Sequence, residues 1–398
     1  MSLDPDTFEQ LRLQVRRFVR ERLVPNEDRV EHEEAVPDEL VAEMRELGLF
    51  GLSIPEDYGG LGLSMAEECE IAMELGQTAA AFRSVFGTNV GIGSQGILMD
   101  GTEAQKREWL PRIASGEAIF SFALTEPDSG SDAASLRTSA ILDGDAYVLN
   151  GTKRYITNAP RAHGFTVMAR TDPGTDGAGG VSAFIVPRET AGVLIGPPDR
   201  KMGQKGTLTC DVTFDNARVP ASLLIGGEPD LGFKTAMRVL DRGRLHIAAV
   251  AVGTSRRLLE DALAYARARR QFGQAIVDFQ LIQAMLADSQ TEVLAAESMV
   301  RDAARRYDRS RTSPDAQMPM VAAACKYFVT EAVGRIADRA VQIHGGAGYM
   351  SEYKVERFYR DVRLLRLYEG TSQILQLVIA KGLKKHGPAE TRRDVPCA

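Results

Sequence analysis

The chain has 398 residues and a formal net charge of −6, and 44% of its residues are hydrophobic while 26% are charged. This composition is typical of an ordinary globular protein, and the length exceeds what one hydrophobic core usually serves, so two or three domains are expected. The acidic balance argues against nucleic acid or an anionic membrane surface as the main partner.

No run approaches the roughly 18 apolar residues that a membrane-spanning helix needs, and the first 30 residues lack a signal core. We therefore expect a cytoplasmic protein that does not bind membranes. Cys69, Cys210, Cys325 and Cys397 are widely spaced and form no CxxC pair. This spacing disfavours a zinc site or a disulfide framework, and no metal site is predicted.

Helical patterns dominate the first third of the chain. Apolar residues recur at helical spacing over residues 8–23, and a second helix is predicted from Pro37 to its stop at Gly48. A further helix begins where Thr102 and Gln105 stand at capping-box spacing. We expect an N-terminal α-helical domain over residues 1–120.

Short apolar or alternating runs follow Gly116, separated by turn dipeptides such as Asp143-Gly144 and Asn150-Gly151. No helix-length segments separate these runs, which favours an antiparallel barrel or sandwich over a βαβ sheet. We expect a central β domain over residues 121–226.

The helical period returns after Gly232 in four long segments, the last running from 353 to about 383. Four long helices indicate a C-terminal bundle, which we place at residues 227–398. The predicted fold class is therefore α+β, with a helical domain, a β domain and a four-helix bundle in that order.

The stretch "GIGSQG", residues 91–96, satisfies the GxGxxG pattern of NAD(P)-binding Rossmann oxidoreductases. That pattern requires a strand before it and a helix opening at it, whereas the preceding region is predicted to be helical. We favour small residues packing a helix–helix contact and keep the Rossmann reading as an alternative.

Two further stretches suit a polar ring system. "FALTEPDSGSD", residues 122–132, places a turn with hydroxyls directly after a buried strand. "TKRYITNA", residues 152–159, carries Tyr155 and Thr157 on one face of a predicted strand. An ordinary hairpin loop and a half-buried strand are equally simple interpretations, so the residues alone leave both open.

Together with "IPEDYGGLGL", "RRQFG", "QIHGGAGY" and "YEGTSQI", these motifs resemble the acyl-CoA dehydrogenase family over essentially the whole chain. The resemblance implies an FAD-dependent oxidoreductase that converts an acyl-CoA, here a short-chain one, to the trans-2-enoyl-CoA in fatty acid β-oxidation. It also implies electron transfer to electron-transferring flavoprotein and a homotetramer built as a dimer of dimers.

The resemblance assigns cofactor-binding roles to three groups of positions. Residues beside the flavin ring and pyrophosphate would be Phe122, Leu124, Thr125, Ser131, Tyr155 and Thr157. Residues that grip an FAD held mainly by a neighbouring subunit would be Arg269, Phe272, Gln280, Gln342, Gly345 and Gly346. Thr371 and Gln373 would contact FAD after the catalytic base. Tyr155 stands where many members of the family have tryptophan.

Glu369 corresponds to the family's catalytic base, which removes the α-proton of the thioester. We expect it in the last turn of an apolar helix that Gly370 ends, where the helix dipole and apolar neighbours favour the neutral acid. The N-terminus of the next helix has the opposite effect. Some members place the base on an earlier helix, at a position that is Gly243 here. Arg244 matches an arginine that fixes the base, and it, Ser131 and Gly370 would also contact substrate.

Arg83 and Ser84 interrupt a run of small and apolar residues. The pair resembles the Arg-Ser of glutaryl-CoA dehydrogenases, which holds the terminal carboxylate of a dicarboxylyl-CoA, although Gly76 replaces that subgroup's acidic residue. A carboxylate elsewhere in the fold, or solvent, is the simpler partner for Arg83.

Two further functions of the whole protein remain alternatives: an oxidase relative, and a non-enzymatic scaffold with the family fold.

Overall fold

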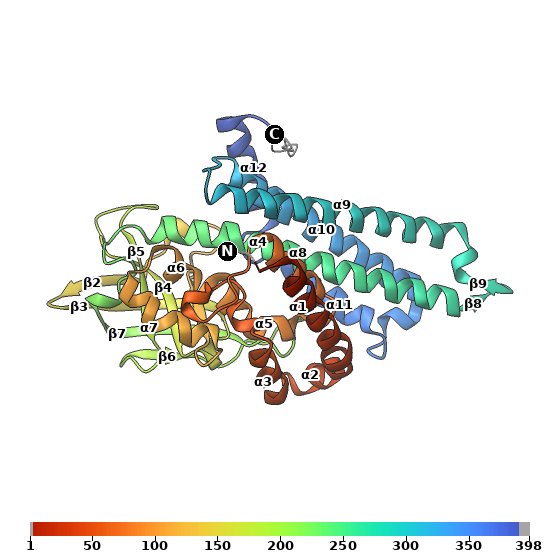
Figure 1. Cartoon of the computed structure of the whole chain (residues 1–398), viewed down its shortest axis with the longest axis horizontal. Helices are drawn as coiled ribbons and strands as arrows, with labels where there is room; N and C mark the ends of the chain where they lie inside the picture. Colours follow the sequence, from red (N-terminus) through yellow and green to blue (C-terminus); the bar gives the residue numbers. More distant parts are fainter. Residues whose placement is uncertain (1–2, 390–398) are drawn as a thin grey trace. The chain divides into compact units, whose positions relative to one another are not determined.

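The computed structural model describes residues 3–389, and the chain divides into two compact units at residues 243 and 244. The first unit contains helices and a β-sheet, and the second, up to residue 389, contains helices and one small hairpin (Figure 1). Helix α8 (Gly232–Ala268) continues across the division. The predicted succession of helices, strands and helices is therefore present.

The first unit begins with α1 (Pro5–Phe18), α2 (Glu27–Glu33), α3 (Asp38–Glu46), α4 (Met65–Leu75), α5 (Ala80–Thr88), α6 (Gln95–Asp100) and α7 (Glu103–Ala114). The predicted capping box of α7 is present. Thr102 Oγ1 accepts from the Gln105 N–H at 3.3 Å, and the Gln105 side chain accepts from the Thr102 N–H at 2.9 Å. The predicted stop after α3 is also present, because Gly48 has a φ of 70°.

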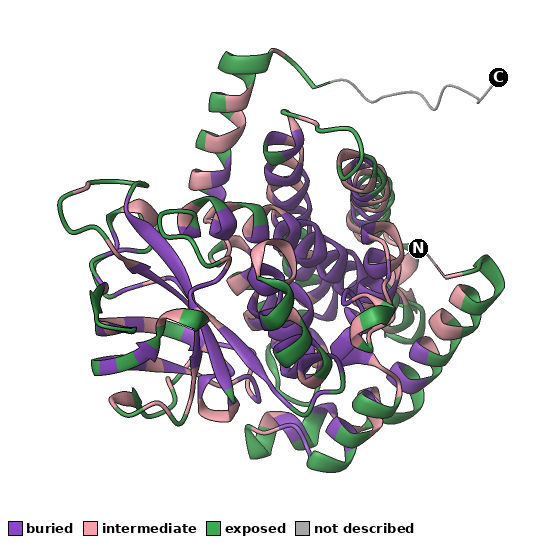
Figure 2. Ribbon diagram, turned by 60° about the vertical axis from the view of Figure 1, so that its left-hand side comes forward, coloured by how far each residue is buried: buried purple, intermediate pink, exposed green. Residues whose placement is uncertain are grey.

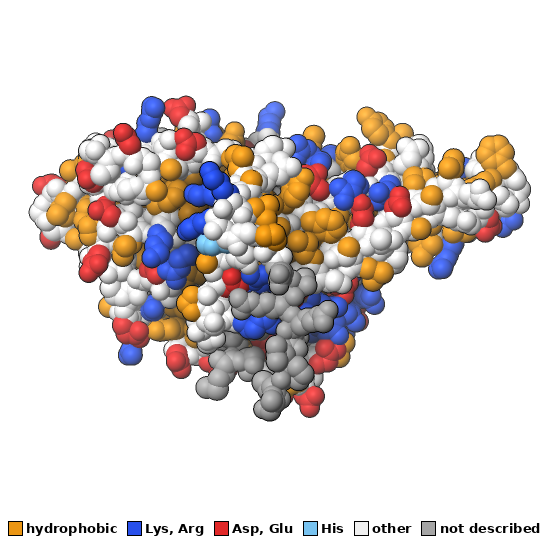
Figure 3. Space-filling model, turned by 90° about the horizontal axis from the view of Figure 1, so that it is seen from above, with side chains coloured by type: hydrophobic (Ala, Val, Ile, Leu, Met, Phe, Trp, Pro, Cys, Tyr) orange, Lys and Arg blue, Asp and Glu red, His pale blue; other side chains and the backbone are white. Residues whose placement is uncertain are grey.

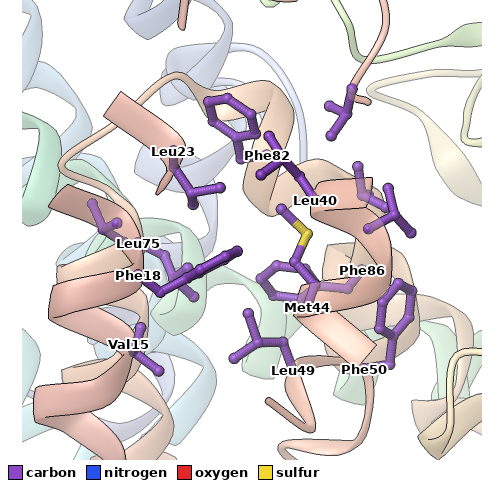
Figure 4. Close-up of a cluster of buried hydrophobic side chains, with 14 of the residues drawn as sticks. Val15, Phe18, Leu23, Leu40, Met44, Leu49, Phe50, Leu75, Phe82 and Phe86 are labelled. Carbon is purple, nitrogen blue, oxygen red and sulfur yellow. The ribbon is translucent and has the colours of Figure 1, made fainter. Parts of the chain in front are cut away.

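Helices α1, α3, α4 and α5 share one hydrophobic core (Figure 4). Phe18, Met44, Leu75 and Phe86 come from these four helices, and the ring of Phe50 meets that of Phe86 edge-on at 5.9 Å. Burial of each such side chain contributes about 1.5–3 kcal/mol. This core fixes α5, the helix that carries the two candidate residues for a terminal carboxylate.

Within the described residues, seven strands form one sheet: β1 (Phe120–Ala123), β2 (Ser139–Asp143), β3 (Ala146–Thr157), β4 (Gly164–Arg170), β5 (Val181–Pro187), β6 (Val193–Ile195) and β7 (Thr209–Pro220). The order is β1-β4-β2-β3-β7-β6, with β5 beside β4. Most pairs are antiparallel as predicted, but β1 and β2 each pair with β4 in parallel. Residues 124–163, between β1 and β4, provide the long crossover that a parallel pair needs.

Strand β4 is buried on both faces, and Figure 2 shows mostly buried backbone through the middle of the sheet. Phe165 and Val167 pack into one core with Phe184 of β5. Met168 packs into a second core with Trp109 of α7. The alternation follows from the period of two in a strand, and it attaches the helices after α5 to one face of the sheet.

The stretch "GIGSQG" lies in helical structure, as favoured from the sequence. A π-helical turn (Asn89–Gly93) leads into α6. The small residues of this stretch meet both a helix and a strand, since a Cβ atom on Gly96 would lie 3.6 Å from Thr235 Cγ2 of α8. A Cβ atom on Gly93 would lie 2.4 Å from the carbonyl oxygen of Phe120 in β1. The small residue is therefore required by the approach of β1.

The second unit contains the rest of α8, then β8 (Arg270–Gln271), β9 (Gln274–Ala275), α9 (Gln280–Ser310), α10 (Met318–His344), α11 (Lys354–Val362) and α12 (Ser372–His386). Helix α10 packs against α9, α11 and α12. The last predicted helix is not continuous, because α11 passes into a 3₁₀ turn (Arg363–Arg366) and a loop precedes α12. Glu369 and Gly370, in this loop, have φ values of 52° and 97°, which no α-helix accommodates.

No helix within residues 3–389 has the length and apolar character to cross a membrane. On the face seen in Figure 3, basic and acidic side chains lie among each other and among hydrophobic ones. Cys69, Cys210 and Cys325 are buried and form no disulfide within the described residues, and burial raises the pKa of the Cys325 thiol to about 12. Cys397 lies outside the described residues.

Candidate active site

The loop after β1 lies against strand β3. The carbonyl oxygen of Leu124 accepts a hydrogen bond from Lys153 Nζ at 3.1 Å, and that of Thr125 accepts one from the Arg154 N–H at 2.8 Å. Phe122 and Leu124 are largely covered, whereas Ser131 is exposed farther along the loop. The structure therefore brings the "FALT" and "KRYIT" segments together, although they are about 30 residues apart in sequence.

A buried ion pair fixes this contact. Lys153 is fully buried, and its Nζ lies 2.7 Å from Glu126, whose carboxylate also accepts from the N–H groups of Arg137 and Thr138. Burial lowers the pKa of Lys153 to about 8. Burial also acts to raise the pKa of Glu126, but Lys153 and the hydrogen bonds hold it below its usual value. No sequence pattern predicts this pair, and its only signal in the sequence is one charged residue within each motif.

Strand β3 has a bulge that sequence periodicity did not predict. The pairing of β3 with β7 shifts register between Lys153 and Ile156, and Tyr155 has a φ of 59°. Lys153 is therefore buried while Tyr155, two residues later, is 64% exposed. Irregular backbone re-aims a side chain, and here it presents an aromatic ring to the outside of the sheet.

Asn158 joins the end of β3 to helix α5. Its Nδ2 donates to the carbonyl oxygens of Ser84 and Val85 at 2.8 and 3.2 Å, and to Thr88 Oγ1 at 2.9 Å. Asn158 is buried and has a φ of 63°. The helix of Arg83 and Ser84 is therefore anchored directly beside Thr157, a link that the sequence analysis missed.

Arg83 is half-buried on α5, where its guanidinium lies against Gly87 one turn later. Ser84 Oγ donates to the carbonyl oxygen of Ala80 at 2.9 Å. Gly76, seven residues before Arg83, ends α4 and offers no carboxylate. The nearby carboxylate of Glu74 is bound by Arg12 and Arg16 at 2.9 and 2.6 Å.

The first unit has a donor set that fits a flavin. Tyr155 offers an exposed ring, the carbonyl oxygen of Thr125 is bonded to the N–H of the adjacent Arg154, and Thr157 follows two residues later. Neither the Thr125 nor the Thr157 hydroxyl hydrogen-bonds to another group within the described part of the chain. An aromatic platform with unused polar groups at its edge is suited to a planar heterocycle.

Glu369 lies in the loop between the 3₁₀ turn and α12, and not in the last turn of a helix as predicted. Its φ of 52° is in the left-handed region, which is uncommon for a residue with a Cβ atom. The carbonyl oxygens of residues 368–370 accept hydrogen bonds from side chains and not from helical N–H groups. Glu369 is partly buried, and Gly370 follows it with a φ of 97°.

Two cationic side chains bind three successive carbonyl oxygens of this loop. Lys326 Nζ, from α10, donates to those of Tyr368 and Gly370 at 2.6 and 2.7 Å. Arg244 Nε, from α8, donates to that of Glu369 at 3.2 Å. Arg244 thus contacts the candidate base, as the resemblance implied. Lys326 was missed, although a lysine in the apolar "AAACKYFV" run of α10 could have drawn attention to it.

The ends of the loop are also fixed. Glu331 of α10 accepts from Ser372 Oγ at 2.5 Å and from Arg366 at 3.1 Å. Thr371 caps α12 by accepting from the Ile374 N–H at 3.2 Å. Gln373 is exposed on the first turn of α12. Helix α10 therefore holds the loop from both sides.

A third group of candidates lies at the other end of the helices of the second unit. The β8–β9 hairpin joins α8 to α9 there (Figure 1), and the rings of Tyr265 and His344 stack at 4.2 Å, which brings the end of α10 beside the end of α8. The candidate residues at this end, which we call the hairpin end, are exposed: Arg269, Phe272, Gln280, Gln342, Gly345 and Gly346. Phe272 is 94% exposed with a φ of 52°.

The structure does not bring the hairpin end to the loop of Glu369. Arg244 and Arg269 are 25 positions apart on a helix and its immediate extension, which corresponds to about 37 Å at 1.5 Å per residue. Residues 3–389 also contain no cluster of three or more His, Cys, Asp or Glu side chains suited to a metal ion.

Comparison with known proteins identifies the class of protein that this fold and these residues define. Models of the N-terminal, middle and C-terminal domains of acyl-CoA dehydrogenase match residues 5–117, 121–217 and 230–384. The chain therefore belongs to the acyl-CoA dehydrogenase family, a family of oxidoreductases. This membership confirms the resemblance and the predicted fold class.

Individual relatives cover nearly the whole chain. The probable acyl-CoA dehydrogenase FadE25 of Mycobacterium tuberculosis is 39% identical over 95% of this chain and 96% of its own length. Butyryl-CoA dehydrogenase from Megasphaera elsdenii is 33% identical, with a TM-score of 0.91 over 97% of this chain and 100% of that one. Glutaryl-CoA dehydrogenase from Mycobacterium smegmatis is 32% identical, with a TM-score of 0.88 over 98% of this chain and 97% of that one.

The bonds of Asn158 lead to a first prediction. Asn158→Asp replaces the donating amide by a carboxylate that faces two carbonyl oxygens, so the first unit should lose more than the roughly 1–3 kcal/mol of one unsatisfied buried polar group. Denaturant unfolding followed by circular dichroism measures the loss. Asn150→Asp, at an exposed position, is the control and should unfold like the wild type. Equal midpoints for the two variants would contradict the role of Asn158.

Proposed function

We propose that this chain catalyses the α,β-dehydrogenation of an acyl-CoA thioester to the trans-2-enoyl-CoA, with FAD as cofactor and Glu369 as the general base. The observation that carries the proposal is the conformation of the Glu369 loop, whose carbonyl oxygens are bound by two cationic side chains. A non-glycine residue in the left-handed region costs about 1–3 kcal/mol and persists only where its surroundings impose it. Here Lys326 and Arg244 supply that constraint at a carboxylate.

The carboxylate of Glu369 takes the α-proton of the thioester in this reaction. Negative charge develops on the thioester carbonyl oxygen as the proton leaves, and hydrogen-bond donors must meet it there. The resemblance to the family points to the backbone N–H of Glu369 as one donor. Arg244 holds the carbonyl oxygen of the same residue, and so fixes the peptide plane that follows the base.

FAD, when bound, supplies the acceptor that takes up the β-hydrogen with its two electrons. The residues proposed to hold it in the first unit are Phe122, Leu124, Thr125, Ser131, Tyr155 and Thr157. Support comes from the exposed ring of Tyr155 and from the hydroxyls of Thr125 and Thr157, which bond to no other described group. Thr371 and Gln373 are proposed to hold it in the second unit.

We keep the division into domains at residues 1–120, 121–226 and 227–398, which the extents of the matched domain models support.

The proposal is tested most directly with the purified protein. It should be yellow, and its flavin should be bleached by at least one acyl-CoA in a panel that varies in chain length, branching and terminal charge, with a dye as final acceptor. A colourless protein that no thioester reduces would contradict both the cofactor and the reaction.

Replacing the proposed base should separate binding from chemistry. Glu369→Gln keeps the size of the side chain but cannot accept the proton, so flavin reduction should slow by roughly 10²–10⁴ while FAD content and acyl-CoA binding persist. Stopped-flow absorbance of the flavin measures the rate. Glu352→Gln, on an exposed glutamate, is the control. Wild-type turnover in Glu369→Gln would refute the assignment of the base.

We propose further that the hairpin end binds the FAD of a neighbouring subunit in a homotetramer built as a dimer of dimers. One FAD molecule is shorter than the roughly 37 Å of helix between Arg244 and Arg269. The guanidinium of Arg269 makes no ion pair within the described residues, and Phe272 is almost wholly exposed. The reduced flavin would then pass its electrons to electron-transferring flavoprotein. We propose that the reaction serves fatty acid β-oxidation.

Arg269→Ala should lower both cofactor retention and assembly. A guanidinium that binds pyrophosphate across a subunit boundary serves both at once, so the flavin-to-protein absorbance ratio should fall and smaller species should appear. Gel filtration with absorbance at flavin and protein wavelengths measures the two together. Arg267→Ala, two residues earlier and also exposed, should behave like the wild type. Unchanged size and stoichiometry in Arg269→Ala would place that side chain in solvent.

A glutaryl-CoA-type dehydrogenase is the second candidate function, and Arg83-Ser84 is the observation that favours it. Asn158 anchors their helix beside Thr157, so a cation lies near the proposed flavin residues. The similar Mycobacterium smegmatis protein is a glutaryl-CoA dehydrogenase. The absence of a carboxylate at Gly76 disfavours it.

The charge of Arg83 decides between the two candidates. Arg83→Met keeps the length of the side chain and removes the charge, so it should raise KM for glutaryl-CoA and leave KM for butyryl-CoA nearly unchanged. A charge-assisted hydrogen bond of about 1.5–3 kcal/mol corresponds to a rise of roughly 10- to 150-fold. Steady-state kinetics with both thioesters measures the ratio. If KM changes equally for the two thioesters, or if the wild type does not turn over glutaryl-CoA, the protein is a short-chain dehydrogenase without preference for an acidic acyl group.

A further inference from the structure

We propose that Lys326 is a positioning residue that aims the backbone N–H of Glu369 at the carbonyl oxygen of the thioester. The inference rests on the proposed function, in which Glu369 is the base and its N–H is a donor to that oxygen. Lys326 touches neither the carboxylate nor substrate in this role. It acts through the peptide bonds on either side of Glu369.

The placement of Lys326 allows this role. Its side chain is fully buried within the second unit, and its Nζ lies between two carbonyl oxygens, those of Tyr368 and Gly370, at 2.6 and 2.7 Å. An ammonium group has three donors and no acceptor, so it binds carbonyl oxygens and rejects N–H groups. The ammonium group of Lys326 therefore turns the C=O edge of the peptide bonds after Tyr368 and after Gly370 toward α10.

Peptide geometry transmits this choice to Glu369. The described chain has no cis peptide bonds, so the C=O of Tyr368 and the N–H of Glu369 point in opposite directions in one plane. Because Lys326 holds the oxygen, the N–H of Glu369 points away from α10. Arg244 holds the carbonyl oxygen of Glu369 and fixes the next plane in the same manner.

The charges around Lys326 are consistent with an ammonium group near neutral pH. Burial lowers the pKa of Lys326 to about 8, the carboxylate of Glu369 raises it, and the guanidinium of Arg244 lowers it further. An apolar side chain of similar size, such as methionine, could fill the space but has no donor for either oxygen. Loss of the ammonium would leave two buried carbonyl groups without their donor and free the peptide planes to rotate.

The test compares Lys326→Met with Cys325→Ala, which removes volume at the adjacent fully buried position of α10 but leaves the two carbonyl bonds in place. The first readout needs neither substrate nor turnover. Hydrogen–deuterium exchange of a peptide covering residues 366–375 in the resting holoenzyme should be faster in Lys326→Met and unchanged in Cys325→Ala.

The second readout reports on the chemical step. Stopped-flow flavin reduction uses the best acyl-CoA from the panel, deuterated at either the α- or the β-carbon. Lys326→Met should slow reduction by roughly 10- to 100-fold, less than the 10²–10³ of deleting an oxyanion donor. The half-saturating concentration should change little, and the isotope effect should grow at the α-carbon but not at the β-carbon. Cys325→Ala should lower the thermal midpoint without altering either isotope effect.

Each outcome has one meaning. Faster exchange in Lys326→Met with wild-type isotope effects would make Lys326 a structural anchor only and overturn the inference, as would unchanged exchange. If Lys326→Met does not fold, Lys326→Leu, which is also uncharged and has no donor, is measured in the same way with the same expectations. Wild-type activity in Glu369→Gln would refute the proposed function itself, whatever Lys326 does.

Discussion

A fully buried lysine holds each of the two segments that carry the candidate chemistry. Lys153 binds the carbonyl oxygen of Leu124 in the first unit, and Lys326 binds those of Tyr368 and Gly370 in the second. Backbone groups buried outside helices and sheets must find partners elsewhere. A long side chain with several donors meets that need without regular structure, so these segments can be irregular and still be well defined.

That irregularity is concentrated where function is proposed. Eight described non-glycine residues have a positive φ, and four of them lie in the candidate segments: Tyr155, Asn158, Phe272 and Glu369. Such conformations are unfavourable and persist where packing and hydrogen bonds impose them. At Tyr155 the consequence is an exposed ring, and at Glu369 it is a carboxylate displaced from the helix that its sequence suggests.

Much of this protein can be predicted from local sequence. Apolar periodicity and capping residues identify the helices, and Thr102 and Gly48 mark two helix ends that the structure reproduces. The motif around Glu369 identified the candidate base before any geometry was known. These features depend on neighbours within a few residues, where the chemistry of the chain acts directly.

Other features were decided only by tertiary structure. The bulge at Tyr155, the parallel pairing of β1 with β4 and the break before α12 are not visible in any period of the sequence. Each depends on a partner far along the chain: Lys153 binds an oxygen 29 residues away, and Lys326 binds one 42 residues away. Periodicity reports which face of an element is buried, whereas the position of a buried charge depends on which carbonyl groups the completed fold leaves within its reach.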